Sequence, residues 1–430
     1  MNTKSILSTV NDELCLGCGT CVSICPVSAI NISVMPSRGI YLPELDQEMC
    51  IECGKCYQVC PGHGVDFEQI NLELFERSTK SDLVGCYKDC YTGYANDSDL
   101  RFNSASGGLL TAVLLFALDH GLITGALITR MSKTNPLDVE PFIARTKEEI
   151  IEASKSKYCP VSANIALKQI LNSEDEKIAV VGLPCHIQGI RKAEMIDDEF
   201  RKKIVLHLGL FCGRCPSYIG TEFLLRVAGV DKSDIVRLDY RGGGWPSGTS
   251  IILKNGNRMF IPYNITWGLI KLFTPRRCTL CSDGACELAD LSFADAWLPE
   301  FSNDKQGLSL VINRSDIGGR LLSMMASSSN IELRPIDVSK ITGRSHKSML
   351  LFKKKSLMAR MRIMKLFGKN TPLYRQMCLF PTYHDYVSAI KLYSIIFIVQ
   401  RRILWALLIP LFKSIIYFKK GDVLTKECSR

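Results

Sequence analysis

The chain has 430 residues, of which 47% are hydrophobic and 22% charged, as in an ordinary folded protein of two or three domains. Its first residues, MNTKSILSTVNDEL, lack the apolar stretch of a secretory signal, so we expect a cytoplasmic protein whose thiols stay reduced. The 19 cysteines are therefore expected to serve as metal ligands and not as a disulfide framework, and the net charge is +10.

Two copies of one cysteine spacing lie near the N-terminus. They are Cys15-x2-Cys18-x2-Cys21-x3-Cys25 and Cys50-x2-Cys53-x2-Cys56-x3-Cys60, each followed by a proline. This is the run of a bacterial two-cluster ferredoxin, in which the fourth cysteine of each run ligates the other cluster. The spacing predicts one 4Fe-4S cluster on Cys15, Cys18, Cys21 and Cys60, and a second on Cys50, Cys53, Cys56 and Cys25. Structural zinc and disulfides are the alternatives that the duplicated spacing disfavours.

Glycines within these runs have a structural purpose. Gly19 and Gly54 are expected to let the backbone bend between neighbouring ligands. Clusters of this kind carry single electrons, so the N-terminal region indicates one-electron transfer.

The middle of the chain has an α/β pattern. Short apolar runs at 126–129, 178–181 and 204–210 alternate with amphipathic helical stretches. The small residues at 104–108, SASGG, precede an apolar helix expected at 109–118. Such a helix N-terminus suits a pyrophosphate, although small residues at this position also serve as an ordinary helix cap.

Four further cysteines follow predicted strands or form a close pair. Cys185 is expected at the N-terminus of a helix after one strand, Cys212 ends another strand, and Cys278-x2-Cys281 is a pair. Singly, they have other interpretations: a nucleophile, a core residue and half a zinc site. Because loops at the ends of parallel strands meet at one sheet edge, we predict that together they bind a third 4Fe-4S cluster. The reserve ligands are Cys215 and Cys286.

A basic segment ends the chain. Residues 340–420 contain 17 Lys and Arg against one acid, Asp385, so the rest of the chain is acidic. Because no nucleic-acid motif accompanies this charge, we expect no nucleic-acid partner.

Two apolar runs in this segment, 392–399 and 403–412, are separated by Gln400-Arg401-Arg402. Each is too short to span a bilayer, so we expect helices that lie on an anionic membrane surface through residues 391–420. Packing on the protein itself or on a partner subunit is the alternative. Pro410 is expected to break or kink the helix.

Six motifs, in order, carry a resemblance to a known family. They are SASGGLLTAVLLFALDHGLITGALI, SKYCPVSANIAL, GLPCHIQGIRK, LGLFC, YRGGGWPSG and CTLCSDGACELADLSFADAW. The stretch from about 104 to about 297 resembles the beta subunits of coenzyme F(420)-reducing hydrogenases and their relatives. The resemblance implies FAD beside a 4Fe-4S cluster with the ligands Cys185, Cys212, Cys278 and Cys281. It also implies a FAD cradle that includes Ser106, Gly107, Gly108, Lys157 and Tyr158.

The expected fold combines α/β and α+β parts in three units. Residues 1–75 form the ferredoxin domain, 80–340 a flavin and iron–sulfur oxidoreductase domain whose halves meet near 176, and 341–430 a basic helical tail. The expected function is an iron–sulfur flavoprotein oxidoreductase that exchanges hydride with a deazaflavin or another organic substrate. His186 is the candidate for its proton donor. The alternative is a non-catalytic electron-relay subunit that serves a redox partner protein. The expected location is cytoplasmic, with peripheral contact to the inner face of the cell membrane.

Overall fold

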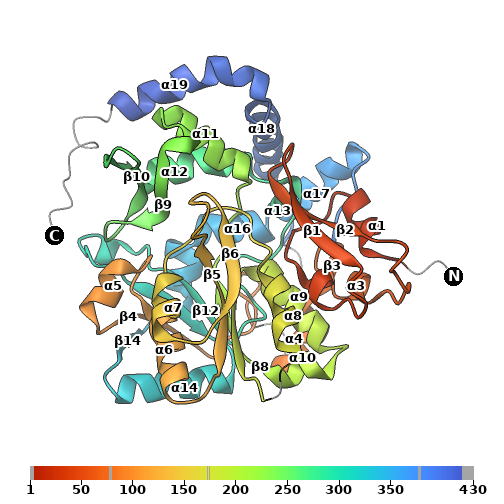
Figure 1. Cartoon of the computed structure of the whole chain (residues 1–430), viewed down its shortest axis with the longest axis vertical. Helices are drawn as coiled ribbons and strands as arrows, with labels where there is room; N and C mark the ends of the chain where they lie inside the picture. Colours follow the sequence, from red (N-terminus) through yellow and green to blue (C-terminus); the bar gives the residue numbers. More distant parts are fainter. Residues whose placement is uncertain (1–3, 77–79, 172, 174, 376–378, 419–430) are drawn as a thin grey trace.

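The N-terminal part of the protein is a small ferredoxin-type unit, red in Figure 1. The structure, a computed structural model, describes residues 4–76, 80–171, 173, 175–375 and 379–418. The unit contains α1 (Ile6–Asn11), α2 (Thr20–Ser23), β1 (Ile30–Met35), β2 (Ile40–Leu45), α3 (Lys55–Gln58), β3 (Gly64–Asp66) and α4 (Phe67–Phe75). Gly19 and Gly54 precede α2 and α3 with φ angles of 88° and 72°, which confirms the bends expected there.

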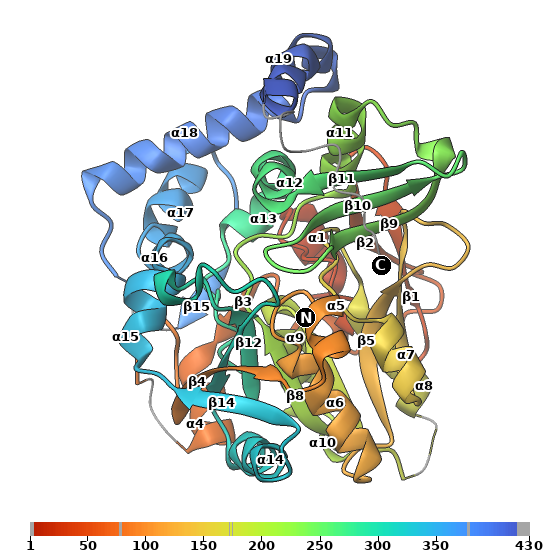
Figure 2. The same cartoon turned by 90° about the vertical axis from the view of Figure 1, so that its left-hand side faces the viewer.

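A mixed eight-stranded sheet forms the centre of the protein (Figures 1 and 2). Its strands, in spatial order, are β14 (Ile331–Pro335), β4 (Asp89–Ala95), β13 (Ser309–Asn313), β12 (Leu291–Asp295), β8 (Ile204–Leu210), β7 (Ile178–Gly182), β5 (Gly125–Met131) and β6 (Val139–Ala144). Strands β12, β8, β7 and β5 are parallel, and the strands outside them pair antiparallel. The strands expected at 126–129, 178–181 and 204–210 are therefore confirmed as β5, β7 and β8.

Helices cover both faces of this sheet. Strand β7 shows the reason, because Ala179 faces one hydrophobic cluster while Ile178 and Val180 face another. The first cluster includes side chains from α6 (Leu109–Asp119), α7 (Lys147–Glu152) and α14 (Asp316–Ser327). The second includes side chains from α4, α9 (Pro184–Glu194) and α10 (Asp198–Lys203). Burial on both faces explains why these strands read as unbroken apolar runs.

A smaller antiparallel sheet stands beside the main one. It consists of β9 (Ile235–Gly242), β10 (Gly248–Leu253) and β11 (Arg258–Pro262), and it packs with α11 (Tyr218–Ala228) and α12 (Tyr263–Ile270). The short helices α5 (Ser98–Asn103) and α13 (Arg276–Thr279) flank the loops that carry the sequence motifs.

The C-terminal segment packs against the rest of the protein. It contains α15 (Val338–Lys340), α16 (Lys347–Lys354), α17 (Leu357–Leu366), β15 (Leu373–Arg375), α18 (Tyr383–Val399) and α19 (Trp405–Phe418). Strand β15 pairs in parallel with β3 of the ferredoxin-type unit. Among the described residues no single helix has the length and apolarity to cross a membrane, but α18 and the segment from Arg402 satisfy that test as a pair bent by 77°.

A break at Pro410 is wrong, because α19 continues through this residue, while a kink there stays a prediction. The bend that the structure shows lies between α18 and α19. Tertiary contacts fix that corner. The Trp405 indole donates to the Val399 carbonyl at 2.9 Å, and Arg402 pairs with Glu222 of α11 at 2.9 Å.

Candidate functional site

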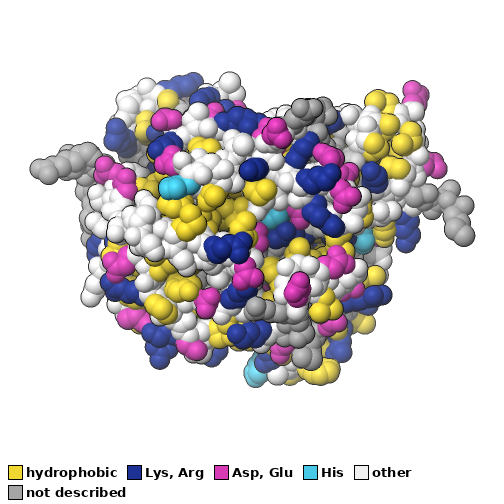
Figure 3. Space-filling model, turned by 90° about the horizontal axis from the view of Figure 1, so that it is seen from below, with side chains coloured by type: hydrophobic (Ala, Val, Ile, Leu, Met, Phe, Trp, Pro, Cys, Tyr) yellow, Lys and Arg dark blue, Asp and Glu magenta, His cyan; other side chains and the backbone are white. Residues whose placement is uncertain are grey.

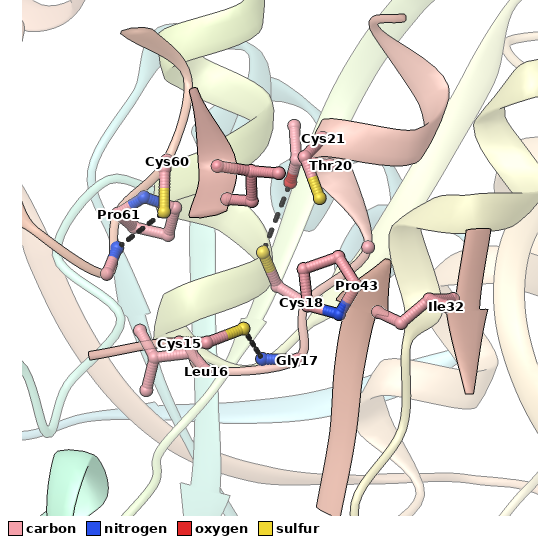
Figure 4. A pocket seen from close by; sticks show the side chains of 13 residues that line it. Cys15, Leu16, Gly17, Cys18, Thr20, Cys21, Ile32, Pro43, Cys60 and Pro61 are labelled. Carbon is pink, nitrogen blue, oxygen red and sulfur yellow. Dashed lines mark hydrogen bonds between the residues drawn. The ribbon is translucent and has the colours of Figure 1, made fainter. Parts of the chain in front are cut away.

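Four cysteines of the ferredoxin-type unit surround one pocket. Cys15, Cys18, Cys21 and Cys60 line it, and Figure 4 shows their sulfur atoms around the same space. The Gly17 amide donates to the Cys15 sulfur and the Gly62 amide to the Cys60 sulfur, each at 3.3 Å. Burial raises the pKa values of the Cys18 and Cys21 thiols. We call these four residues the proximal group.

The other four cysteines of the paired runs lie together near the surface. Cys25, Cys50, Cys53 and Cys56 line a cavity of about 320 Å³, and the Cys53 side chain is exposed. We call them the distal group. The structure thus brings together the members of each predicted ligand set, including the crossed positions Cys60 and Cys25.

A third group of cysteines lies at the edge of the main sheet. Cys185 is in the first turn of α9, as predicted, Cys212 follows β8, and Cys278 and Cys281 lie in and after α13. Strand β12 begins beside the end of β8, where Leu291 pairs with Leu208. The segment before β12, which contains Cys278 and Cys281, therefore lies at the same sheet edge as Cys212. Burial raises the pKa of Cys185 well above its usual value, and the charges of Cys18, Cys212, Cys278 and Cys281 raise it further.

The third group consists of thiols that would need a bound metal centre to ionise. Several buried thiols that oppose one another's ionisation need a cationic core to exist as thiolates. Among the residues that the structure describes, no group of three or more Cys, His, Asp or Glu side chains is arranged around a single metal-ion position. The donor set fits a 4Fe-4S cluster, whose four thiolates stand at separate corners.

The two reserve cysteines have other contacts. The Cys215 amide donates to the Cys278 thiol, and its own thiol donates to the Cys159 carbonyl at 3.5 Å. Cys286 is fully buried, and a Cβ atom placed on Gly209 would lie only 2.5 Å from its sulfur. The Cys286 side chain therefore fills space between strand and loop.

Asn164 joins the proximal group to the third group, and sequence reasoning missed it. Its backbone amide donates to the Cys18 carbonyl at 3.0 Å. Its side-chain amide donates to Thr20 Oγ1 at 2.8 Å and to the His186 carbonyl at 3.0 Å. Arg277, beside Cys278, donates to the carbonyls of Pro61 and Gly62 at 3.0 and 2.8 Å. These bonds seat the proximal group against the loops of the third group.

One buried arginine connects four of the sequence motifs. The Arg241 guanidinium, 1% exposed, donates to the Ala105 carbonyl, to Ser247 Oγ, to the Tyr158 hydroxyl at 2.9 Å and to Asp295 at 3.1 Å. Sequence reasoning missed this residue, although it stands directly before the Gly242–Gly244 run. Because its partners come from distant parts of the chain, only the folded structure identifies it. We call Arg241, Tyr158, Ser247 and Asp295 the arginine cluster.

Aromatic rings adjoin the arginine cluster. The rings of Trp245 and Trp297 are 4.4 Å apart between centroids, and the Tyr263 ring stacks on Trp297 at 5.6 Å. The Arg241 guanidinium lies 4.8 Å from the Tyr263 ring centroid. Trp297 is 36% exposed, so this aromatic group is accessible from solvent.

Three other residues predicted for the FAD cradle, Ser106, Gly107 and Gly108, directly follow Ala105, whose carbonyl accepts from Arg241. Ser106 Oγ donates to the Leu308 carbonyl at 2.7 Å, and the Gly107 amide donates to Ser309 Oγ at 2.9 Å. A Cβ atom on Gly107 would meet the Ser309 nitrogen at 2.6 Å, so only glycine allows this close approach. Gly108, with φ of 77°, is the N-cap of α6. A flavin contact for these residues stays a prediction.

Two predicted site residues, Lys157 and His186, form hydrogen bonds to the backbone through their polar side-chain atoms. Lys157 Nζ donates to the Ser154 and Lys155 carbonyls at 2.8 and 3.0 Å, and burial lowers its pKa to about 7. His186 Nδ1 accepts from the Leu183 amide at 3.2 Å, and Nε2 lies 3.1 Å from the Val161 carbonyl. Burial lowers the pKa of His186 to about 4. These contacts favour structural roles, while a counter-charge and a proton donor stay predictions.

Three family models match the chain. The model for the N-terminus of the coenzyme F(420) hydrogenase/dehydrogenase beta subunit matches residues 90–168, and the model for its C terminus matches residues 175–339. The model for a 4Fe-4S dicluster domain matches residues 14–64.

Individual relatives cover most of the chain. The coenzyme F(420) hydrogenase subunit beta of Methanothermobacter thermautotrophicus is 28% identical over 264 residues, 59% of this chain and 87% of that protein. A subunit of the F(420)H(2) dehydrogenase of Methanosarcina mazei is 22% identical over 351 residues, 79% of this chain and 90% of that protein. A chain of the F(420)-reducing [NiFe] hydrogenase complex from Methanosarcina barkeri shares the fold, with a TM-score of 0.54, 23% identity and coverage of 68% of this chain and 97% of that chain.

Proposed function

The chain belongs to the family of coenzyme F(420) hydrogenase/dehydrogenase beta subunits, and we propose that it is an iron–sulfur flavoprotein oxidoreductase. Its electrons would pass between two ferredoxin-type 4Fe-4S clusters, a third 4Fe-4S cluster and FAD, with hydride exchange to a deazaflavin or another organic substrate. The observation that carries the proposal is that the cysteine groups, as possible cluster sites, lie next to one another. The proximal group adjoins the third group, since Asn164 donates both to the Cys18 carbonyl and to the carbonyl of His186, which follows Cys185.

The cysteine groups would hold the three clusters. The proposed ligands are the proximal group, the distal group and the third group, each with four thiolates. The proposed FAD site comprises the arginine cluster with Ser106, Gly107 and Gly108. When bound, the clusters carry one electron each, whereas a flavin accepts either one electron or two, which links them to hydride chemistry.

The residues of the chain would supply position and environment. Arg241 holds the 104–108 loop, β9 and β12 together through its four acceptors. The Phe211 ring, beside Cys212, lies 5.0 Å from the His346 ring, and the Phe211 amide donates to the Phe293 carbonyl. These contacts would help to limit the access of water next to Cys212, as hydride chemistry requires.

The test is a count of cofactors. The full chain would be purified without oxygen, and iron, acid-labile sulfide and flavin would be measured per chain. We expect about twelve irons and one FAD. Eight irons without flavin, after reconstitution with iron, sulfide and FAD, would refute the flavoenzyme.

A non-catalytic relay subunit is the second candidate, favoured by the exposed Cys53 of the distal group, which offers an open electron entrance. The relatives above are also named as subunits. A relay would retain its clusters but reduce no deazaflavin or other organic acceptor by itself. Turnover by the isolated chain with reduced deazaflavin would therefore separate the two functions.

We also propose a cytoplasmic location with peripheral contact to an anionic membrane. Ile403, Leu407 and Leu411 are 85%, 71% and 63% exposed and recur at helical spacing from the corner along α19. The face opposite α19, shown in Figure 3, mixes cationic and anionic side chains, whereas residues 391–418 contain four Lys and Arg and no acid. Residues 419 and 420 of the expected membrane segment lie outside the described residues.

Vesicle sedimentation tests the membrane contact. We expect the protein to bind vesicles that contain phosphatidylglycerol, and Leu407→Asp to abolish this binding because it puts charge on the apolar stripe. Leu72→Asp is the matched control, since Leu72 is a 56% exposed leucine on α4. Failure of the unmodified protein to bind would refute the contact.

A further inference from the structure

A buried lysine from the C-terminal segment lies among the loops of the third group. Lys353 is on α16 and is 1% exposed. A Cβ atom placed on Gly284 would lie 3.1 Å from Lys353 Cγ, and the Gly284 carbonyl accepts from the Cys212 amide at 2.9 Å. The aliphatic stem of Lys353 therefore rests on the loop that follows Cys281.

Neighbouring contacts hold the lysine in this place. Lys354, the next residue, forms a buried ion pair with Glu287. The Arg360 guanidinium donates to the Thr279 carbonyl at 2.6 Å, which ties α17 to the turn between Cys278 and Cys281. The segment is thus anchored at two positions that follow Lys353, by contacts that do not involve the Lys353 charge.

The Lys353 side chain is buried beside the loop that follows Cys281, and the Cys212 amide donates to the same loop at Gly284. Within the described part of the chain, no carboxylate lies within ion-pair distance of Lys353. A buried ammonium is costly without an anionic partner, and four thiolates around a cluster supply that partner.

We propose that Lys353 is a positioning residue whose positive charge sets the reduction potential of the third 4Fe-4S cluster. A thiolate-ligated cluster gains one negative charge on reduction, and nearby charge, burial and hydrogen bonds decide how costly this is. Burial favours the oxidised form, and Lys353 offsets this effect. The inference rests on the proposed third cluster, but Lys353 lies beyond residue 339, where the family match ends.

The test is an anaerobic redox titration of the full chain with dithionite, followed by electron paramagnetic resonance. The third-cluster signal is identified by its loss in Cys185→Ser. Lys353→Met should make reduction of this cluster at least tenfold less favourable, a downward shift of 59 mV or more for one electron. The two other clusters should keep their potentials, and Lys353→Arg should restore the original value. Lys347→Met is the matched control, because Lys347 is an exposed lysine of the same helix.

The outcomes separate the two proposals. An unchanged third-cluster potential in Lys353→Met would overturn the role of the lysine while leaving the cluster in place. An equal shift of all three clusters would also overturn it, because that result indicates a general structural change. Lys353→Gln, which keeps a polar end, provides a second charge-free variant if the methionine variant does not fold. Absence of a third signal in the unmodified protein would refute the third cluster and the inference with it.

Discussion

Replacing Cys212 by serine should remove the third cluster and leave the other two. Cys212 follows β8, and its amide is anchored on the Gly284 carbonyl at 2.9 Å, so the serine variant keeps the loop in place. Three 4Fe-4S clusters hold about twelve irons and two hold about eight. We therefore expect Cys212→Ser to lose about four irons per chain while it retains the signals of the proximal and distal clusters.

Cys215→Ser is the informative control for this experiment, because the spacing Cys212-x2-Cys215 allows either residue to be a ligand. In the structure, the Cys215 thiol donates to the Cys159 carbonyl at 3.5 Å, and the Cys215 amide donates to the Cys278 thiol. The Cys215→Ser variant should therefore keep about twelve irons. Cys286→Ser should do the same, because the Cys286 sulfur packs against Gly209.

Iron and sulfide analysis of protein purified without oxygen, together with electron paramagnetic resonance of the reduced protein, measures these differences. The reasoning is refuted if Cys215→Ser loses four irons and Cys212→Ser loses none. Loss of all clusters from Cys212→Ser would contradict the separation between the groups, since the ferredoxin-type unit has its own eight cysteines.

Two further predictions concern buried charges. Arg241→Met should lower the FAD content well below one per chain and destabilise the protein by about 3–5 kcal/mol, because it leaves a carboxylate of β12 unpaired; Arg237→Met, an exposed change on the same strand, should do neither. Burial lowers the pKa of His207, but Glu194 and Asp290 raise it above its usual value overall. This pair of contacts should stabilise the protein fully below about pH 6.5 and progressively less as the pH rises through the folded-state pKa. In urea unfolding, His207→Gln should therefore reduce the free energy of unfolding most at low pH. An equal reduction at every pH would contradict a stabilising positive charge on His207.

The features that the sequence predicted depend on local patterns. The spacing of the two eight-cysteine runs follows from how a tight turn presents thiolates, so it identifies each set without any knowledge of distant contacts. The apolar runs of β5, β7 and β8 were predictable because a strand buried on both faces needs continuous hydrophobic residues. Cys185 was correctly placed at a helix start because Pro184 occupies the first turn of α9.

The features that the sequence did not predict depend on long-range contacts. In the sequence, nothing distinguishes Arg241 from other arginines expected in strands. Its partners Ala105 and Asp295 are distant in the sequence and meet it only in the folded protein. Lys353 lies in a segment that composition assigns to a basic tail, yet it is buried beside cysteines some 70 to 140 positions earlier in the chain. A sequence pattern cannot show which few of many cations become buried, because burial depends on the packing of the whole chain.

The placement of the sites bears on whether the chain is an enzyme or a relay. In Figure 1 the ferredoxin-type unit and β9, which carries Arg241, lie on opposite sides of α13 and α16. A relay needs only two exposed one-electron sites. The side of the protein away from the ferredoxin-type unit instead has the buried Arg241, which hydrogen-bonds to residues of four sequence motifs. Next to it lies the solvent-accessible aromatic group around Trp297. Planar rings and a fixed cation suit an organic two-electron carrier, for which a pure relay has no use. The arrangement therefore favours the proposed enzyme, which would exchange single electrons at the distal group and electron pairs at the arginine cluster, in either direction.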